Sequence, residues 1–468
     1  MQTNELKQTA SKKIPRILIG AASSGSGKTT ITCGLLQALI NRGLKVSSFK
    51  CGPDYIDPMF HSRVIGASSA NLDLFFSDAD TVRYLFANSA GDSDISVIEG
   101  VMGYYDGLSI TSSQASAYDV AVTLDIPTIL VVDAKGASAS VVATILGFLN
   151  YKEDHHIKGV ILNRMSERVY NEIKELITER LGIAVLGYVP PMPEMVIESR
   201  HLGLVTPDNI ADLKSRLNFI ADVFEKTLDI DQIIALAQTA PEFSHQPQLL
   251  TPVEGAPRIA VAKDEAFCFM YKDNLDLLKE LGAELVYFSP LHDKAVPDAD
   301  GLILYGGYPE LYAEKLSANQ TMITSIKELM AKGLPCLAEC GGFMYLHEEM
   351  EDAQGHFYPM CGVVAGKTYK TTKLVRFGYV NLTAPKPNWL LKSQESVKAH
   401  EFHYWNSTNC GQDLLATKAA GNKSWECSHA AERLFAGYPH LFYRSCPELI
   451  KRFLEVCRAF RADTGQIP

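Results

Sequence analysis

One cysteine of this chain follows an apolar stretch and precedes two glycines, in the run P-C-L-A-E-C-G-G-F-M-Y-L from Pro335 to Leu346. The pattern is typical of a buried strand that turns sharply into a helix, because glycines fit where a crowded turn leaves no room for a Cβ. A helix N-terminus lowers the pKa of a thiol, which makes Cys340 a candidate nucleophile. A small buried hydrophobic residue is the alternative interpretation, and this stretch alone favours neither.

A nucleophilic cysteine needs a base, and histidine is the usual one. The downstream candidates are His356, His400, His403, His429 and His440. His400 and His403 stand one residue closer together than the histidines of a zinc-peptidase H-E-x-x-H motif, so we exclude that class. His440 follows a short Gly-Tyr-Pro turn, and on sequence alone it competes closely with His403 for the role of base.

Acyl transfer to a thiol also needs donors for a developing oxyanion. The turn Y-G-G-Y-P-E follows a predicted strand over 301–305 and ends at Glu310. The backbone N–H of Gly341, with one from Gly306 or Gly307, would then face a carbonyl bound at Cys340 and form an oxyanion hole.

A second chemical motif, S-S-G-S-G-K-T-T, lies near the start of the chain between an apolar strand and an apolar-periodic helix. This context is that of a phosphate-binding loop. The backbone from Ser24 to Lys28, including Gly25 and Gly27, would cradle phosphates, with Lys28 on the β/γ oxygens and Thr29 on Mg²⁺. The first position of the pattern is Ala22 rather than glycine.

Charged residues follow the next two strands of this half. Lys50 leads into C-G-P-D-Y-I-D-P, which carries Asp54 and Asp57, and Glu99 ends a strand in E-G-V-M-G-Y-Y-D-G, with Asp106 shortly after. An acidic residue at the tip of a buried strand that faces a phosphate loop is the usual second anchor for Mg²⁺, which favours Glu99. Asp54 and Asp57 fit turn chemistry equally well.

Three further polar residues follow predicted strands or lie in loops. Asn163 ends a strand in G-V-I-L-N-R, where its amide could read a nucleotide base. Arg200 and His201 lie in a predicted loop, where they would either meet ligand carboxylates or form a solvated surface pair.

Composition limits the classes of protein to consider. A length of 468 residues predicts two or three domains, and 47% apolar with 21% charged residues is typical of a soluble globular protein. A net charge of −10 argues against general nucleic-acid or membrane-surface binding. Neither a signal peptide nor a transmembrane helix is expected, and ten cysteines without paired spacing indicate reduced thiols in a cytoplasmic protein.

The elements that must position these residues alternate as strands and helices. Strands are predicted over 16–22, 45–50, 95–100, 127–134, 157–163, 184–189, 258–263, 284–288 and 301–305, and helices over 140–151, 166–182, 209–239 and 270–282. The proline-rich stretch 241–257 is the best linker. We therefore predict an α/β protein of two doubly wound domains, 1–240 and 258–468, with ligands at the carboxyl ends of the strands.

Taken together, these stretches resemble the cobyrinate a,c-diamide synthase family of glutamine-dependent corrinoid amidotransferases. The resemblance rests on eight motifs in order: S-S-G-S-G-K-T-T, K-C-G-P-D-Y-I-D-P, E-G-V-M-G-Y-Y-D-G, R-H-L-G-L, Y-G-G-Y-P-E, A-E-C-G-G-F-M-Y-L, H-E-F-H-Y and G-Y-P-H-L. The first half is similar to dethiobiotin synthetase-like ATPases with a P-loop, and the second to class I glutamine amidotransferases.

The resemblance implies roles that the residues only suggest. Cys340 would be the glutaminase nucleophile and His440 its base, with Gly307 and Gly341 at the oxyanion hole. Related amidotransferases carry a glutamate two residues after that histidine, but here Phe442 stands there. The third member of the triad is thus absent from its usual place.

The activity implied is ATP- and Mg²⁺-dependent amidation of the a- and c-carboxylates of cobyrinate in cobalamin biosynthesis, through acyl phosphates. Lys50, Asp54, Asp57 and Asp106 would lie near the reacting carboxylate, and Arg200, His201 and His403 would contact substrate. Small molecules are the expected partners, without nucleic acid or membrane.

Two other functions remain open on the sequence. In the first, the same amidation acts on hydrogenobyrinate or nickel-sirohydrochlorin as the substrate. The second, from another class, is a P-loop switch ATPase with an inactive amidotransferase domain. The sequence leaves open the identity of the tetrapyrrole and its metal, and whether the chain forms a homodimer. It also leaves open the ammonia path, the order of the amidations and the group that orients His440.

Overall fold

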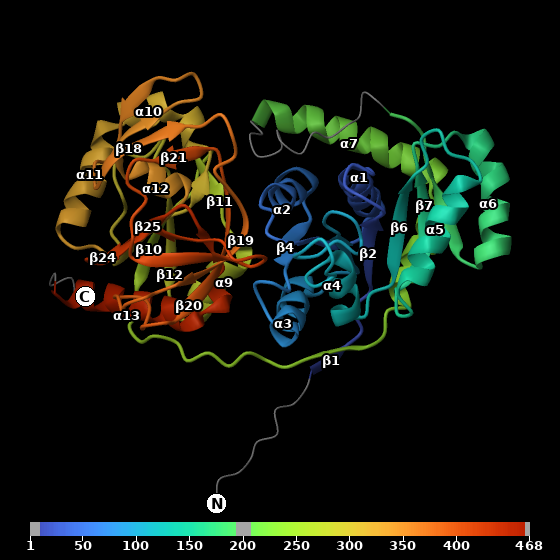
Figure 1. The fold of residues 1–468 in the computed structure, drawn as a ribbon, viewed down its shortest axis with the longest axis horizontal. Coiled ribbons are helices and arrows are strands. Elements are labelled where there is room, and N and C mark those ends of the chain that lie inside the picture. Colours follow the sequence, from blue (N-terminus) through green and yellow to red (C-terminus); the bar gives the residue numbers. More distant parts are fainter. Residues whose placement is uncertain (1–9, 193–206, 464–468) are drawn as a thin grey trace, which may run out of the picture. The chain divides into compact units, whose positions relative to one another are not determined.

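The computed structural model describes residues 10–192 and 207–463, which form two compact units divided after Gln248. This point lies within the proline-rich stretch 241–257. Figure 1 traces the chain through both units, the first from blue to green and the second from yellow to red. Each unit has its own hydrophobic core.

Unit 1 is built on a seven-stranded parallel sheet. In order across the sheet its strands are β4 (Ser68–Leu72), β3 (Val46–Cys51), β5 (Ile95–Glu99), β2 (Arg16–Ala21), β6 (Thr128–Asp133), β7 (Ile157–Asn163) and β8 (Ala184–Val189). The strands are buried almost throughout, as expected for a parallel sheet covered on both faces.

Helices cover both faces of this sheet (Figure 1). One face packs against α3 (Ala79–Ala90), α4 (Ala117–Leu124), α5 (Ser140–Tyr151) and α6 (Glu167–Leu181). The other packs against α1 (Lys28–Asn41), the short α2 (Ile56–Phe60) with η1 (His61–Ile65), α7 (Pro207–Thr227) and α8 (Ile230–Gln238). Alternate residues of β2 supply the two cores, since Leu18 points to the first and Ile17 and Ile19 to the second. The doubly wound prediction is confirmed for this unit.

The prediction of a single helix over 209–239 is wrong, because the structure has two helices there, α7 and α8. Leu228 forms a β-bridge with Gly187 of β8, and Asp229 then caps α8 by accepting a hydrogen bond from the Gln232 N–H. The apolar periodicity continues across the break, so the pattern alone did not reveal it. A two-stranded ribbon of β1 (Ala10–Lys12) and β9 (Phe243–His245) completes the unit.

Unit 2 is built on a six-stranded sheet with one antiparallel edge strand. Its strands are, in order, β12 (Glu284–Phe288), β10 (Arg258–Ala262), β13 (Gly301–Leu304), β15 (Cys336–Glu339), β25 (Leu434–Gly437) and β24 (His429–Ala431). One face carries α9 (Lys272–Glu280) and α13 (Pro447–Asp463), and the other carries α10 (Ala313–Ala318), α11 (Gln320–Ala331) and α12 (Gly341–Tyr345). The second doubly wound sheet is thus also confirmed.

The residues between α12 and α13 form further strands that the sequence analysis did not predict. A five-stranded antiparallel sheet has the order β23 (Ser424–Cys427), β22 (Leu414–Lys418), β19 (Arg376–Thr383), β20 (Ser396–His403) and β26 (His440–Leu441). A four-stranded sheet consists of β17 (Phe357–Pro359), β16 (His347–Glu351), β18 (Val364–Lys370) and β21 (Trp405–Ser407). Earlier in the chain, before α12, β11 (Phe267–Phe269) pairs with β14 (Gly306–Gly307).

None of the helices in the described parts of the chain combines the length and apolar character that crossing a membrane requires. All ten cysteines lie in the described parts, and each is a free thiol.

Candidate active sites

The phosphate-loop sequence connects β2 to α1 at the carboxyl edge of the sheet in unit 1. Gly25 and Gly27 both have positive φ, of 77° and 90°. A Cβ on Gly27 would lie 2.3 Å from Nδ2 of Asn163, so this position excludes any side chain. Nδ2 of Asn163 donates to the Ser26 carbonyl at 2.8 Å, and in this way the end of β7 supports the loop. Ser24 lies at the exposed tip.

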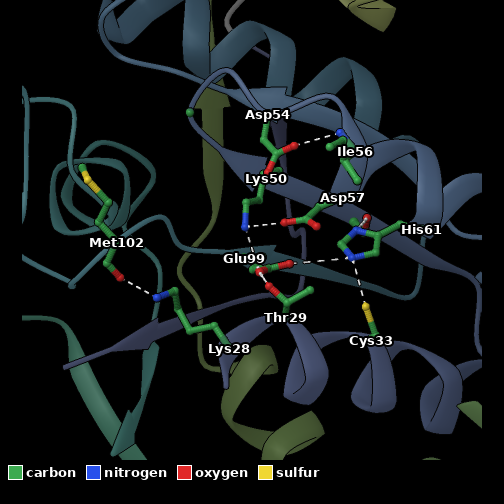
Figure 2. A network of polar contacts seen from close by, with 12 residues as sticks. Lys28, Thr29, Cys33, Lys50, Asp54, Ile56, Asp57, His61, Glu99 and Met102 are labelled. Carbon is green, nitrogen blue, oxygen red and sulfur yellow. Dashed lines mark hydrogen bonds and ion pairs between the residues drawn. The ribbon is translucent and has the colours of Figure 1, made fainter. Parts of the chain in front are cut away.

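Lys28 and Thr29 begin α1 and point toward the end of β5 (Figure 2). The hydroxyl of Thr29 donates to Oε1 of Glu99 at 2.7 Å, and Nζ of Lys28 donates to the carbonyl of Met102. Burial, with a contribution from the nearby charge of Lys50, lowers the pKa of Lys28 to about 8. A bound polyphosphate would raise that pKa again, because an anion stabilises the ammonium form.

Lys50 is the centre of a buried ionic cluster. Its Nζ lies 2.8 Å from Oε1 of Glu99 and 2.7 Å from Oδ2 of Asp57 (Figure 2). Burial alone would lower the pKa of Lys50, but Glu99 and Asp57 raise it well above its ordinary value. Removing one member would leave an uncompensated buried charge, so we expect the cluster to act as a unit.

The two carboxylates respond differently to this cation. Burial raises the pKa of Glu99 despite the opposing effect of Lys50. For Asp57 burial also raises the pKa, but the charge and hydrogen bond of Lys50 outweigh it, so the pKa is lowered. Glu99 ends β5, and Asp57 lies in α2, the short helix that follows β3 (Figure 2).

Asp54 and Asp106 lie at the edges of this cluster. Oδ1 of Asp54 accepts the Ile56 N–H at 2.8 Å, and burial together with the charge of Asp57 raises its pKa to about 7. Oδ2 of Asp106 accepts the Gly103 N–H at 2.8 Å, which shapes the turn after β5. Asp54 thus has both the turn geometry of an Asx motif and a proton that it can hold near neutral pH.

His61 belongs to this site and was missed by the sequence analysis. It is fully buried, with Nδ1 2.8 Å from the Ser48 hydroxyl and Nε2 3.6 Å from Sγ of Cys33 and 3.7 Å from Oε2 of Glu99. Burial lowers its pKa to about 4. A single histidine in an apolar helical stretch gives no sequence signal that separates it from an ordinary core residue.

The donor set beside the phosphate loop fits Mg²⁺. Oε1 of Glu99 is engaged by Thr29 and Lys50, whereas its buried Oε2 has no hydrogen-bond partner among residues 10–192 and 207–463. Magnesium prefers such hard oxygen ligands, and it usually takes one or two from the protein and the rest from phosphate and water. Thr29 and Glu99 could hold the ion, and the loop could hold the phosphates.

The second site lies at the carboxyl end of β15 in unit 2. Cys340 joins this strand to α12 with φ 48° and ψ −104°, a conformation that non-glycine residues rarely adopt. Its N–H donates to the carbonyl of Gly437 on the neighbouring β25 at 2.7 Å, and only 7% of the residue is exposed. The strand-to-helix turn therefore holds this side chain in a strained geometry, as in nucleophile turns of other folds.

The lowered pKa that we expected for Cys340 is wrong for this state of the protein. Burial, and next the charge of Glu310, raises the pKa of the thiol above its ordinary value, and the hydrogen bond from Gly341 offsets only part of this. The following helix is a single short turn. Cys340 is therefore a thiol that must lose its proton to a base during the reaction.

Of the competing histidines, His440 is placed beside Cys340. A Cβ added to Gly306 would lie 2.3 Å from Cε1 of His440 and 3.3 Å from Cβ of Cys340, so both side chains crowd this glycine. His403 is instead stacked on Tyr438 at 3.9 Å, with Nδ1 2.6 Å from the carbonyl of Trp405. Burial, with smaller contributions from His400 and His403, lowers the pKa of His440 to about 3, so its ring is neutral.

The glycines of the turn after β13 approach the nucleophile closely. An added Cβ on Gly341 would lie 3.1 Å from the backbone N of Gly307. A Cβ on Gly307 would lie 2.0 Å from the carbonyl of Ala266, which leaves room for glycine only. The N–H groups of Gly307 and Gly341 are thus neighbours at the carboxyl end of the sheet, as an oxyanion hole requires.

The close approach of His440 to Gly306 yields a prediction. Gly306→Ala should lower glutamine hydrolysis at least about 100-fold, because the new methyl group displaces the base by more than an ångström from its working geometry. On the division of labour expected from the sequence, unit 2 only supplies ammonia, so amidation supported by ammonium chloride should stay near the wild-type rate.

The matched control is Gly147→Ala in α5, where an added Cβ meets no heavy atom within 4 Å. Steady-state glutamate release and melting temperature are measured for both variants. Normal glutaminase activity in Gly306→Ala would contradict the placement of His440.

Arg200 and His201, predicted to contact substrate, lie outside the described residues. The other predicted site residues lie in the two sites described above, one beside the phosphate loop of unit 1 and the other around Cys340 in unit 2.

Comparisons with known proteins match both units. The nucleotide-binding domain family named CobQ/CobB/MinD/ParA matches residues 17–204, and the CobB/CobQ-like glutamine amidotransferase domain family matches residues 258–447.

Full-length relatives cover almost the whole chain. The cobyrinate a,c-diamide synthase of Caldanaerobacter subterraneus subsp. tengcongensis is 39% identical over 95% of this chain and 98% of its own length. The enzymes of the same name from Listeria monocytogenes and Salmonella typhimurium are 40% and 37% identical, over 92% and 94% of this chain and 97% and 98% of their own lengths.

Proposed function

The chain belongs to the cobyrinate a,c-diamide synthase family, and we propose that it amidates the a- and c-carboxylates of cobyrinate with nitrogen from glutamine. It is an amide-forming ligase that combines a P-loop nucleotide-binding domain with a glutamine amidotransferase domain. The observation that carries the proposal is the presence of two sets of reactive groups in one chain. A buried Lys–carboxylate cluster adjoins a phosphate loop in unit 1, and a cysteine and a histidine crowd the same glycine in unit 2.

In unit 2, glutamine is hydrolysed at Cys340. His440 takes the thiol proton as sulfur attacks the amide carbon, and the N–H groups of Gly307 and Gly341 hold the oxyanion. The proton then passes to the leaving nitrogen, so ammonia departs and a thioester remains. Water hydrolyses the thioester to glutamate and restores the thiol.

In unit 1, a carboxylate of the substrate attacks the γ-phosphorus of ATP, the bond to the β-phosphate breaks, ADP leaves, and an acyl phosphate forms. Ser24, Gly25, Gly27 and Lys28 would hold the phosphates, and Thr29 and Glu99 would hold Mg²⁺, which would supply neutralising charge. Asn163 keeps the loop in shape through its bond to Ser26. Ammonia then displaces phosphate from the acyl carbon to form the amide.

Lys50, Asp54, Asp57 and Asp106 are our candidates for handling the substrate carboxylate. Lys50 offers a cation at the reacting group, and Asp54, whose pKa is raised to about 7, can take a proton from the attacking ammonia. The family assignment and the ten free thiols support a place for this reaction in the cytoplasm.

Mass spectrometry of candidate macrocycles tests the substrate. We expect cobyrinate incubated with ATP, Mg²⁺ and glutamine to gain two amides, each replacing a hydroxyl by an amino group, while two glutamate molecules appear. Hydrogenobyrinate and nickel-sirohydrochlorin are assayed in parallel. Amides on one of these and none on cobyrinate would reassign the substrate, and ATP hydrolysis without any amide would favour the switch ATPase.

A further inference from the structure

The carboxylate of Glu339 lies beside the base of the glutaminase site. Oε2 of Glu339 is 4.0 Å from Nδ1 of His440 and accepts the Leu441 N–H at 3.3 Å, and Oε1 accepts the Tyr443 hydroxyl at 3.1 Å. Three residues of one short segment thus surround this carboxylate. Glu339 is also the residue directly before Cys340.

The segment that carries His440 is held in place from two sides. Asn274 of α9 donates to the carbonyl of Leu441 at 2.8 Å and accepts the N–H of Tyr443 at 2.8 Å, while Glu339 binds the same two residues through Leu441 N–H and the Tyr443 hydroxyl. All of these groups are buried. Buried hydrogen bonds therefore anchor the backbone that places the His440 side chain next to Glu339.

Proton transfer to His440 needs an anion close to Nδ1. The ring is buried, and two neighbouring histidines further disfavour its cationic form. A carboxylate on Nδ1 would hold the ring with Nε2 toward the nucleophile and would stabilise the imidazolium, as the aspartate does in serine proteases. Position 442, where related amidotransferases carry a glutamate, is Phe442 in this chain.

Two other acids near the nucleophile are placed differently. Glu310, Glu401 and Glu339 each raise the pKa of the Cys340 thiol, so this effect does not distinguish the three acids. Glu401 faces His403, with 3.9 Å between Oε2 and Nε2. Glu339 faces His440 instead, with 4.0 Å between Oε2 and Nδ1.

We propose that Glu339 is the positioning residue of the glutaminase site: its carboxylate accepts the Nδ1–H of His440 and stabilises the imidazolium formed when the Cys340 proton moves to Nε2. The inference rests on the proposed glutaminase function. The 4.0 Å separation exceeds a hydrogen bond by about 1 Å, and such contacts commonly tighten when substrate binds.

The test compares Glu339→Gln with Glu339→Asp and with Asp300→Asn. Asp300 is a buried acid at the opposite end of the same sheet, where it accepts the Arg258 N–H at 2.7 Å. We expect Glu339→Gln to lower kcat for glutamine hydrolysis by about 100- to 10,000-fold with little change in KM, as in triads that lose their acid. Glu339→Asp should recover part of the rate, and Asp300→Asn should hydrolyse glutamine like the wild type.

A pH profile separates positioning from structural support. Burial raises the pKa of Glu339 to about 8, against the opposing hydrogen bonds of Tyr443 and Leu441. Below that pH the group is protonated, so glutamine kcat should rise with pH and level off above about 8. The groups that face the carboxylate are Tyr305 after β13, Cys340, His440 and Tyr443. Glu339→Gln should lose this rise.

Tyr443→Phe provides a second variant that keeps the carboxylate. Removing the hydroxyl donor raises the pKa of Glu339 further, so the midpoint of the profile should move to higher pH while the rate at high pH is retained. A midpoint that stays in place, or Glu339→Gln within threefold of wild-type kcat, would overturn the proposal. Wild-type protein without any glutaminase activity would instead overturn the proposed function.

Discussion

Replacing Cys340 with alanine should abolish glutamine-supported amidation and leave ammonia-supported amidation near the wild-type rate. The sulfur at the end of β15 is the only group at this position able to form the thioester, so its removal should lower glutamine turnover by at least about 10,000-fold, as loss of a nucleophile does in serine proteases. The synthetase groups lie in unit 1, and added ammonia replaces the product of the thioester route. Amide formation is measured with each nitrogen source at saturating ATP.

The matched control is Cys336→Ala, four residues earlier at the start of β15 and also buried. Its thiol packs in the core, so this variant should lose stability but keep the wild-type ratio of glutamine-supported to ammonia-supported rates. If Cys340→Ala lost both activities while it melted at the wild-type temperature, the division of labour between the units would be wrong.

Replacing Lys28 with alanine should remove amidation with either nitrogen source. We propose its ammonium group as the P-loop cation for the β- and γ-phosphates, and loss of such a charge from a phosphoryl-transfer site typically costs about 1,000-fold, or roughly 4 kcal/mol of transition-state stabilisation. Glutamate release by unit 2 should persist, since none of its groups is altered. ADP production and amide formation are measured with ammonia as the nitrogen source, together with glutamate release.

Lys45→Ala is the control for Lys28→Ala, because Lys45 is an exposed lysine directly before β3. We expect unchanged kinetics for it. An ammonia-supported rate in Lys28→Ala within tenfold of wild type would remove Lys28 from the phosphate site.

The sequence predicted the parallel sheets well and the antiparallel ones poorly. Apolar runs define β7 and β8, which are largely buried, and also the more exposed edge strand β12, and all three have the predicted bounds. In the 347–441 region strands such as β18 and β19 mix buried and exposed residues, and some partners lie far away in the chain, as for β20 with β26. Local pattern contains no information on such pairings.

The same distinction explains what was missed at the sites. Lys28, Thr29 and Cys340 belong to local motifs whose spacing encodes their geometry. His61 and Glu339 act through contacts across the fold, with Glu99 and His440 as their respective neighbours. The prediction of a lowered pKa for Cys340 was wrong for a related reason. Burial raises this pKa, and the burial of a side chain depends on elements that the motif does not contain.

The backbone at Cys340 has a consequence for how this enzyme can change over time. A non-glycine residue at φ 48° and ψ −104° stores about 1–3 kcal/mol of strain, and glycine at this position would release it. The variant with glycine at position 340 is therefore more stable but lacks the nucleophile. Selection for thermal stability and selection for glutamine use thus favour different residues at this position. A lineage supplied with free ammonia could lose its glutaminase without any penalty in folding, and would keep a working ligase.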